Sequence, residues 1–319
     1  MKLIKGIHHV SSLTADARSN YAFYTDVLGM RLVKKTVNQD DPGMYHLFYA
    51  DRYGSPGTDF TFFEIPMAGR TYRGSQSISS TGLRVKSDEA IYFWKERLEK
   101  QQVSVGEPVI RAGRLTLALE DHEGQRIRLF SDRHGAATPA GTAWEHPDIP
   151  EDVAIVGLGP SELTVRSLAK TENVLINVLS FIKTGGEQTE EGPMTVYSTA
   201  SGGNGAEVHV IQSSESKERP GRGSVHHLAL RVEDEEELKE WKQAIDDAGY
   251  DNSGIVERYY FTSLYFRDSN GILFELATDG PGFDMDEPIE QLGQKLALPP
   301  FLEERREEIE QKLKPIKAD

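Results

Sequence analysis

Two histidine doublets and one glutamate are the residues of this chain best suited to chemistry. The doublets are His8-His9 in GIHHVSSLTAD and His226-His227 in SVHHLALRVED, and the carboxylate is Glu275 in DSNGILFELATDG. Each lies in a short apolar run that predicts a β-strand. Two imidazoles and one carboxylate hold Fe(II) or a similar divalent ion on one side and leave coordination positions open. If one histidine of each doublet meets the glutamate, the chain is a metal enzyme that acts on small molecules.

An internal repeat supplies the reason to expect that meeting. The segment 77–103, SISSTGLRVKSDEAIYFWKERLEKQQV, matches 224–250, SVHHLALRVEDEEELKEWKQAIDDAGY, without a gap. The offset stays at 147 positions, from 94 to 241 between two tryptophans and from 124 to 271 between two glycines. Such a match identifies a duplicated structural unit, and overlooking it would misassign the fold.

A second, weaker repeat relates the beginning of the chain to its middle. HHVSSLTADARSNYAFYTDVLGMRLVKK resembles GPSELTVRSLAKTENVLINVLSFIKTGG at an offset of 151, from 28 to 179 and from 30 to 181. Segments rich in Gly, Pro and Ser separate the units. We therefore expect four modules, at residues 4–66, 78–133, 153–213 and 222–278.

Each module follows one pattern of elements. A strand precedes a helix, and further strands follow up to a glycine turn and a last apolar strand. In the fourth module, apolar residues at Leu238, Trp241 and Ile245 predict a helix that stops at Gly249. The expected class is α+β with βαβββ modules. Residues 279–319 carry Glu/Arg and Glu/Lys pairs at helical spacing and predict a helical tail for packing or for a homodimer contact.

Composition narrows the class of protein. The chain has 319 residues, 38% of them hydrophobic, which suffices for two domains with cores of their own. A net charge of −15 argues against nucleic acid or an anionic membrane as partner. The sequence contains no run of transmembrane length and no signal-peptide core at its N-terminus. Cysteine is absent, so disulfides and thiolate sites are excluded, and a cytoplasmic location fits.

The modules resemble those of the vicinal oxygen chelate superfamily, which includes glyoxalases, extradiol dioxygenases and antibiotic-resistance binding proteins. The resemblance rests on H-V or H-L at the module start, on G-x-x-[FWYL]-E at its end, and on NYAFYTDVLGM, which is similar to the family's F-Y-x-x-x-L-G-[ML]. It covers residues 4–278. It implies that the modules pair into two cupped mixed-sheet domains, with the helical tail outside them.

The same resemblance selects one histidine from each doublet. Neighbouring strand residues point to opposite faces, so only one of each pair looks into the cup. The family spacings to the L-G turn and to the end of the L-x-V strand favour His9 and His227, and Glu275 stands where the family has its terminal carboxylate. The inner modules carry no equivalent ligand set, because the aligned residues are Ser80 and Arg128 in module two and Pro160 in module three. We therefore expect module one to pair with module four around the metal.

Two further residues bear on the reaction. Tyr265 stands ten positions before Glu275, where extradiol enzymes carry a tyrosine close to the bound phenolate. Their acid–base histidine is missing here, and RYYFTSLYF offers Arg258, Tyr259 or Tyr260 instead. Glu64, interpreted as the module-one counterpart of Glu275, would as a fourth ligand make the site closer to glyoxalase.

The resemblance implies a bacterial ring-cleaving dioxygenase of the hydroquinone-linked, extradiol type. It would use Fe(II) and O₂ on a small aromatic substrate, and Mn(II), Ni(II) and Zn(II) fit the same ligand types. The alternatives are a glyoxalase-like isomerase or lyase and a small-molecule-binding resistance protein. Phe60, Phe62 and Tyr45 are candidates for an aromatic pocket wall. The remaining histidines are assigned structural roles, with His46 able to reach the cup and His209 interpreted as a remnant without partners: His46, His122, His134, His146 and His209.

Overall fold

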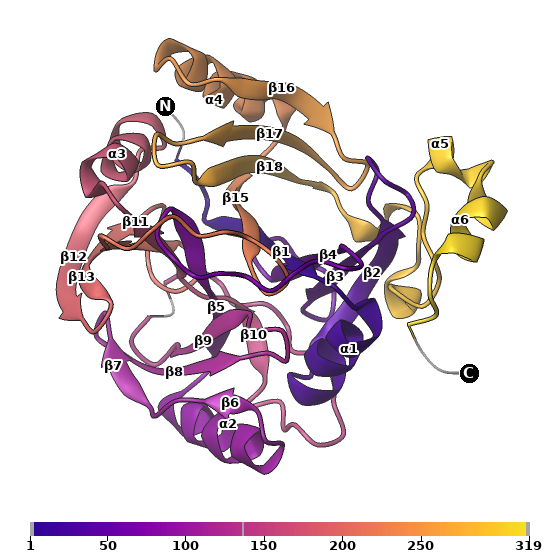
Figure 1. The fold of residues 1–319 in the computed structure, drawn as a ribbon, viewed down its shortest axis with the longest axis horizontal. Coiled ribbons are helices and arrows are strands. Elements are labelled where there is room, and N and C mark those ends of the chain that lie inside the picture. The colour runs from indigo at the N-terminus through magenta and orange to yellow at the C-terminus, as the bar shows by residue number, and fades with distance from the viewer. Residues whose placement is uncertain (1–2, 136, 317–319) are drawn as a thin grey trace.

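Two mixed β-sheets form the body of the protein in the computed structural model, which describes residues 3–135 and 137–316. The first sheet has eight strands in the order β16-β17-β18-β15-β1-β4-β3-β2 and draws them from both ends of the chain (Figure 1). Its strands are β1 (Ile7–Thr14), β2 (Arg31–Val37), β3 (Tyr45–Ala50), β4 (Asp59–Glu64), β15 (Val225–Val232), β16 (Asn252–Glu257), β17 (Phe261–Arg267) and β18 (Leu273–Pro281).

The second sheet has ten strands and comes from the middle of the chain. Eight run in the order β12-β13-β14-β11-β5-β9-β8-β6, while β10 pairs with β5 and β7 with β8. The strands are β5 (Ser77–Val85), β6 (Ser104–Val105), β7 (Val109–Arg111), β8 (Arg114–Glu120), β9 (Arg126–Ser131), β10 (Ile155–Leu158), β11 (Ser161–Val165), β12 (Ile182–Thr189), β13 (Gly192–Ser198) and β14 (Glu207–Gln212).

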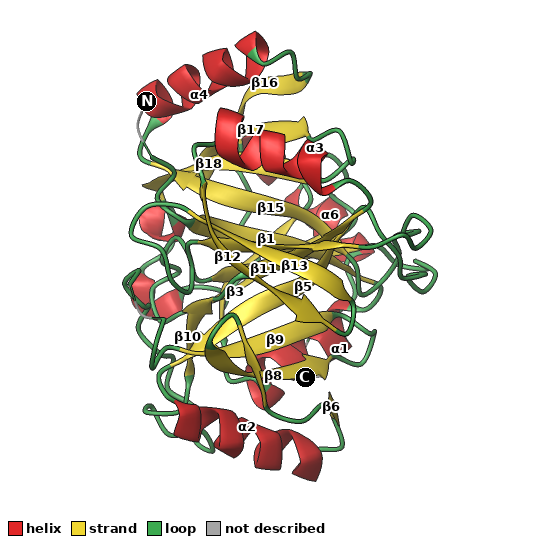
Figure 2. Cartoon of the chain, turned by 90° about the vertical axis from the view of Figure 1, so that its left-hand side faces the viewer, coloured by secondary structure: helices red, strands yellow, loops and turns green. Residues whose placement is uncertain are grey.

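Helices lie outside the sheets, and Figure 2 shows α2 and α4 at opposite ends of the molecule. The predicted α+β class with two mixed sheets is thus confirmed. The helices are α1 (Ala17–Ala22) with a π-helical turn at Phe23–Val27, α2 (Asp88–Lys100), α3 (Leu168–Asn173) with a π-helical turn at Val174–Val178, α4 (Glu235–Asp247), α5 (Pro300–Glu303) and α6 (Arg306–Lys312). Short 3₁₀ turns occur at Phe283–Met285 and Ile289–Gln291. None of the helices in the described ranges is long and apolar enough to cross a membrane.

The helix predicted in the fourth module forms as its apolar spacing indicates. The Asp234 side chain accepts a hydrogen bond from the backbone amide of Glu237 and caps the N-terminus of α4. Trp241 and Ile245 are buried against the sheet. The chain leaves the helix through Gly249, whose φ of 77° is a left-handed conformation that glycine adopts without strain.

The 147-residue repeat has a physical cause in a shared turn. Asp121 and Asp268 each accept hydrogen bonds at 2.8–2.9 Å from the backbone amides two and four residues ahead. Gly124 and Gly271 occupy these turns with φ of 85° and 90°. The aspartate closes the loop and the glycine supplies the positive φ, so both residue types are needed at the same spacing. The turn delivers β9 and β18 to their sheets.

The four segments that we propose as modules, 4–66, 78–133, 153–213 and 222–278, each contribute a leading strand, a helix and further strands. The first and last share one sheet, as expected from the distribution of the candidate ligands. The tail differs in part from the prediction, since most of 282–299 is irregular and only two short helices follow.

The tail is anchored by a buried ammonium group. Lys34 on β2 is 0% exposed. Its Nζ donates hydrogen bonds to Phe283 O at 3.0 Å, to Asp286 at 2.6 Å and to Glu287 at 2.5 Å. Asp286 also accepts a hydrogen bond from the Tyr260 hydroxyl at 2.9 Å. The tail therefore fixes Tyr260, a residue that borders the cavity described below.

We expect Lys34→Met to release the tail. Removing one partner of a buried ion pair costs about 3 kcal/mol, because the remaining charges stay poorly solvated. The thermal midpoint should fall, and limited proteolysis should cleave the tail faster. Lys239→Met on the exposed face of α4 is the matched control. An unchanged cleavage rate in Lys34→Met would contradict the anchoring role.

Candidate metal centre and substrate cavity

The antiparallel pairing of β1 with β15 brings the two histidine doublets together. His9 pairs with Ala229 and Ser11 with His227, so the two doublets are offset by two positions across the ladder. Residues two apart on a strand share a face, and His9 and His227 therefore project to the same side. β18 runs parallel to β15 and pairs Glu275 with Ala229, which adds the carboxylate to that side.

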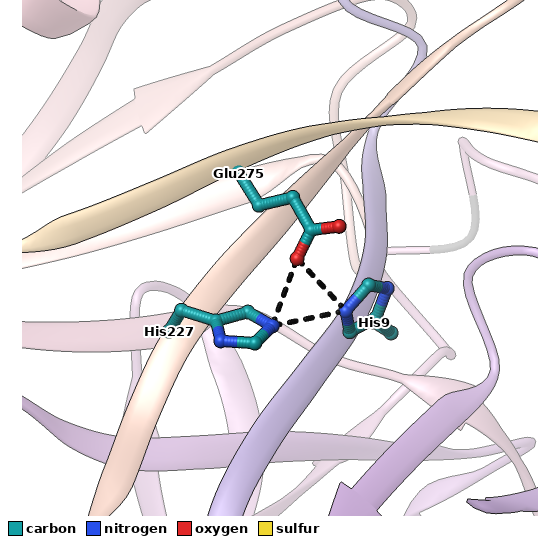
Figure 3. Close-up of side chains that lie close together, drawn as sticks. All are labelled: His9, His227 and Glu275. Carbon is teal, nitrogen blue, oxygen red and sulfur yellow. Dashed lines mark hydrogen bonds and ion pairs between the residues drawn. The ribbon is translucent and has the colours of Figure 1, made fainter. Parts of the chain in front are cut away.

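Three side-chain atoms from these strands converge on one point (Figure 3). His9 Nε2 lies 3.1 Å from His227 Nε2. Glu275 Oε2 lies 2.8 Å from His227 Nε2 and 3.2 Å from His9 Nε2. All three residues are buried, and among the described residues they are the one cluster of three or more metal-ligating side chains.

The carboxylate of Glu275 is fixed but not fully satisfied. Ser263 Oγ donates a hydrogen bond to Glu275 Oε1 at 2.5 Å, whereas Oε2 meets no donor in hydrogen-bonding geometry. Burial opposes ionisation, yet the neighbouring His9 and His227 hold the pKa of Glu275 well below its ordinary value. An ionised, buried oxygen with two imidazole nitrogens beside it is a donor set that suits a divalent cation.

The first histidine of each doublet orients the second. His8 Nε2 lies 3.1 Å from the carbonyl of Thr278, so this nitrogen must donate its proton there. Burial, together with nearby His9, lowers the pKa of His8 to about 3, and a neutral His8 keeps an unprotonated Nδ1. That Nδ1 lies 2.9 Å from His9 Nδ1, which must be the donor. His9 Nε2 is then left with a lone pair directed at the cluster.

The second doublet has the same contact in a more open setting. His226 Nδ1 lies 2.8 Å from His227 Nδ1. His226 is exposed and borders the cavity, whereas His227 is buried. Burial lowers the pKa of His227, which favours the neutral imidazole that a metal ligand requires. His8 thus contacts the neighbouring strand β18 through Thr278, and the first histidine of each doublet also touches the one that follows it.

A cavity of about 360 Å³ opens over the histidine pair. Phe and Tyr side chains form part of its wall beside four histidines, and further polar residues, among them Asn38, Gln39 and Asp40, also border it. The residues that border the cavity include His9, His46, Phe48, Phe63, His227, Arg258, Tyr260, Phe261 and Tyr265. A concave, largely apolar site with a few convergent polar groups is typical of a small-molecule site.

Tyr265 borders the cavity beside the candidate ligands. Its ring centroid is 5.7 Å from that of His227, and its backbone pairs with Glu275. Arg258 Nε donates to the Tyr265 oxygen at 3.4 Å, which leaves the phenol proton to point elsewhere. Burial raises the pKa of Tyr265, so the hydroxyl stays protonated at neutral pH. Of the three residues considered as replacements for a histidine here, Tyr260 is engaged by Asp286, and Arg258 is the one that contacts Tyr265.

His46, which was assigned a structural role but considered able to reach the cup, does border the cavity. Its Nε2 lies 3.1 Å from Thr61 Oγ1, and its ring packs on Phe63 and Phe48 with centroids 4.0 Å apart. Burial lowers the pKa of His46 well below its ordinary value. The signal that could have identified it is alternation in YHLFYA, where His46 and Phe48 share one face of β3.

The predicted aromatic wall is wrong. Phe60 and Phe62 lie in the core with Tyr24, on the helix side of β4. Tyr45 borders a different cavity, beside Trp144. The cause is strand parity, because in the parallel pairing with β1 the positions level with His9 and Ser11 are 59 and 61. Odd-numbered residues of β4 therefore face the cup, and Phe63 occupies the wall.

The interpretation of Glu64 as counterpart of Glu275 is also wrong. Ser11 and Ala229 stand two residues after the candidate ligands, and they pair with Thr61 and Glu275 respectively. Thr61 is thus the equivalent of Glu275. Glu64 faces the helix layer and accepts a hydrogen bond from the backbone amide of Ala17 at 3.0 Å. It caps α1 and lies outside the ligand cluster.

The interpretation of His209 as a remnant without partners is wrong, because its Nε2 lies 3.1 Å from Glu207 Oε2. It pairs with Glu162 across β11 and β14 and is the third-module equivalent of Glu275. His122, His134 and His146 lie outside the metal cluster.

Comparison with known proteins agrees with this architecture. The chain is 54% identical over 315 residues, 98% of its length, to the protein named "Putative ring-cleaving dioxygenase MhqA" of Bacillus subtilis (strain 168), and it covers 99% of that relative. It is 32% identical over 317 residues to chlorohydroquinone/hydroquinone 1,2-dioxygenase of Sphingobium indicum, covering 96% of this chain and 95% of that one.

Solved structures show the same fold. A Bacillus subtilis protein described as a "putative dioxygenase" superposes with a TM-score of 0.91 at 36% identity over 99% of both chains. Glyoxalase I of Zea mays superposes with a TM-score of 0.60 at 13% identity over 86% of this chain and 92% of that one, and at this identity it shows the fold alone. The family model of the glyoxalase/bleomycin resistance protein/dioxygenase superfamily matches residues 6–129 and 157–276, and the chain belongs to that superfamily.

Proposed function

We propose that the protein is a ring-cleaving dioxygenase that opens hydroquinone- or catechol-type aromatics with O₂ at an Fe(II) centre. The observation that carries the proposal is the convergence of His9 Nε2, His227 Nε2 and Glu275 Oε2 within 3.2 Å at the base of an aromatic cavity. Two relatives that match nearly the whole chain carry ring-cleaving or hydroquinone dioxygenase names.

The donor set supports Fe(II) as the ion. Two imidazoles and one carboxylate on one side of an ion are the ligands of non-haem iron oxygenases, and Mn(II), Ni(II) and Zn(II) accept the same donors. When bound, such an ion supplies a redox-active Lewis acid with open positions for an ionised phenol and for O₂. Two features support a three-ligand site over the four-ligand site of a glyoxalase. Glu64 caps α1, and Thr61 occupies the position equivalent to Glu275.

The protein's own share of the reaction is to position the ring and manage protons. Phe63, Phe48 and Phe261 provide flat apolar surfaces that hold an aromatic ring over the histidines. Tyr265 keeps its phenol proton, and because Arg258 donates to the Tyr265 oxygen, that proton remains available to a ligand in the cavity. The tyrosine would therefore hydrogen-bond a phenolate oxygen of the substrate.

His46 is the best candidate for the proton acceptor. Burial keeps its imidazole neutral, and a neutral imidazole can take a proton from the phenol as the substrate binds. Thr61 Oγ1 lies 3.1 Å from His46 Nε2, and Ser11 Oγ lies 2.7 Å from Thr61 Oγ1, so a hydroxyl pair orients the ring. His46 would then act in place of the acid–base histidine that extradiol enzymes carry and that is missing before Tyr265 in this chain.

The overall reaction balances without a further reductant. One ring C–C bond beside a hydroxylated carbon breaks, both atoms of O₂ enter the product, and the new ends are a carboxylic acid and a carbonyl group. We propose this extradiol type of cleavage for the chain. The ring substituents are set by the shape of the cavity around Phe63 and Arg258.

Metal analysis after anaerobic purification should find about one ion per chain. His227→Ala should weaken metal binding by more than the roughly 10–100-fold that loss of a supporting residue costs, because a direct ligand is removed. Glu64→Gln is the matched control and should keep wild-type affinity. Full metal content in His227→Ala would refute the ligand assignment.

Oxygen uptake with methylhydroquinone or catechol should be stoichiometric with substrate, and ¹⁸O₂ should label both new oxygens of the product. A hemithioacetal should give neither oxygen uptake nor isomerisation. Turnover of the hemithioacetal, with no uptake on either aromatic, would favour the isomerase alternative over the dioxygenase.

His46→Gln should lower kcat by about 10²-fold, because general-base catalysis contributes roughly that factor. Glutamine keeps a hydrogen-bonding group near Thr61 but cannot accept the proton. Metal content and KM should change little. His134→Gln, at an exposed position, is the control. Equal kcat values for His46→Gln and wild type would exclude the role.

A further inference from the structure

The inner modules form a second cup whose chemistry differs from that of the first. The second cup is defined here by the cavity of about 500 Å³ bordered by Ser80, Leu119, Arg128, Glu162 and Ile211. Its geometry repeats that of the metal centre, because β5 pairs with β9 as β15 pairs with β18. Gly82 opposite Arg128 corresponds to Ala229 opposite Glu275.

A guanidinium therefore stands where the first cup has its carboxylate. Ser80 takes the position of His227, and Pro160 that of His9. The replacement inverts the local charge and removes both imidazoles, so this cavity holds no metal set among the described residues. A cup of the same shape with a buried cation at its centre is suited to an anion.

Arg128 is buried in the cavity wall and makes only long polar contacts. It is 8% exposed, its Nη1 reaches Thr116 Oγ1 only at 3.5 Å, and its Nε stands 3.4 Å from Glu162 Oε1 without a hydrogen bond. Leaving a buried guanidinium with such long contacts is costly unless another group completes them.

Two neighbouring ion pairs are matched without Arg128. Arg73 contacts Glu120 at 2.6 Å and Arg126 contacts Glu218 at 2.9 Å. Glu162, the acid nearest Arg128, lies 2.6 Å from Arg111 Nε. Arg111 also meets Glu191 at 3.3 Å, but half of that side chain is exposed to solvent, which weakens its field.

The rest of the cavity wall indicates what kind of anion would fit. Val105, Leu119 and Ile211 offer apolar contact, and Ser80 brings a hydroxyl group. A carboxylate matches the planar fork of a guanidinium in a bidentate arrangement, and an apolar body would cover the aliphatic side chains.

We propose that the second cup is a binding site for a small organic carboxylate, held by Arg128 and Ser80. The site is separate from the metal centre, and its occupancy requires no turnover there. The proposal rests on the charge and geometry of the inner modules and is independent of the reaction assigned to the first cup.

Calorimetric titration of the full-length protein with benzoate, sorbate and inorganic phosphate tests the proposal. Benzoate is a ring acid and sorbate an open-chain acid, so the stronger binder identifies which source of carboxylate the site takes. Arg128→Gln should weaken binding of that acid by about tenfold or more, because a charge-assisted bidentate contact is lost. His227→Ala, which alters only the first cup, should bind it as wild type does.

A second variant distinguishes a loss of binding from a folding defect. Ser80→Ala removes one hydroxyl and adds no bulk at this buried position, so it should weaken binding less than Arg128→Gln while leaving the thermal midpoint unchanged. The proposal is overturned if neither acid binds, if Arg128→Gln binds as wild type does, if His227→Ala abolishes binding, or if phosphate binds as tightly as the acids.

Discussion

The pairing of β1 with β15 is the contact on which the rest of the structure depends. It joins residues near the N-terminus to residues more than two hundred positions later and makes one sheet of the two ends of the chain. The register of this ladder, with Ser11 opposite His227, sets which histidines share a face. A slip of one residue would turn the second doublet over and take His227 away from His9 and Glu275.

Much of the fold followed from the sequence because its signals are local and repeated. The 147-residue offset reflects a turn that needs aspartate and glycine at fixed spacing, and the helix at Glu235–Asp247 follows from its apolar face and its cap. The convergence of His9, His227 and Glu275 was expected from the same repeat. These residues are constrained by both strand parity and module geometry.

The errors share one physical origin. The run DFTFFE is largely buried on both faces of β4 and places phenylalanine on each, so its aromatic residues alone do not say which side meets the cup and which meets α1. That choice is made by the register against β1, a contact between segments about fifty residues apart. Glu64 was misassigned for the same reason. The sequence around Glu64 resembles that around Glu275 in β18, but Glu64 lies three residues beyond Thr61, which is the structural equivalent of Glu275. His46 was undervalued because β3 carries aromatic residues on both faces.

The two cups show how one scaffold separates shape from chemistry. The strand ladders are equivalent, but the positions that hold an imidazole and a carboxylate in one cup hold serine, proline and arginine in the other. Scaffold positions of this kind tolerate exchange because each side chain projects from a strand whose backbone bonds are independent of it.

The division of the candidate ligands between distant strands also has a consequence during synthesis. Chains emerge from the ribosome N-terminus first, and His9 and His227 are separated by 218 positions. A partly made chain therefore carries one histidine alone, which binds a divalent ion weakly. The full donor set exists only after β18 has been added beside β15, so the three candidate ligands cannot meet until most of the chain has been made.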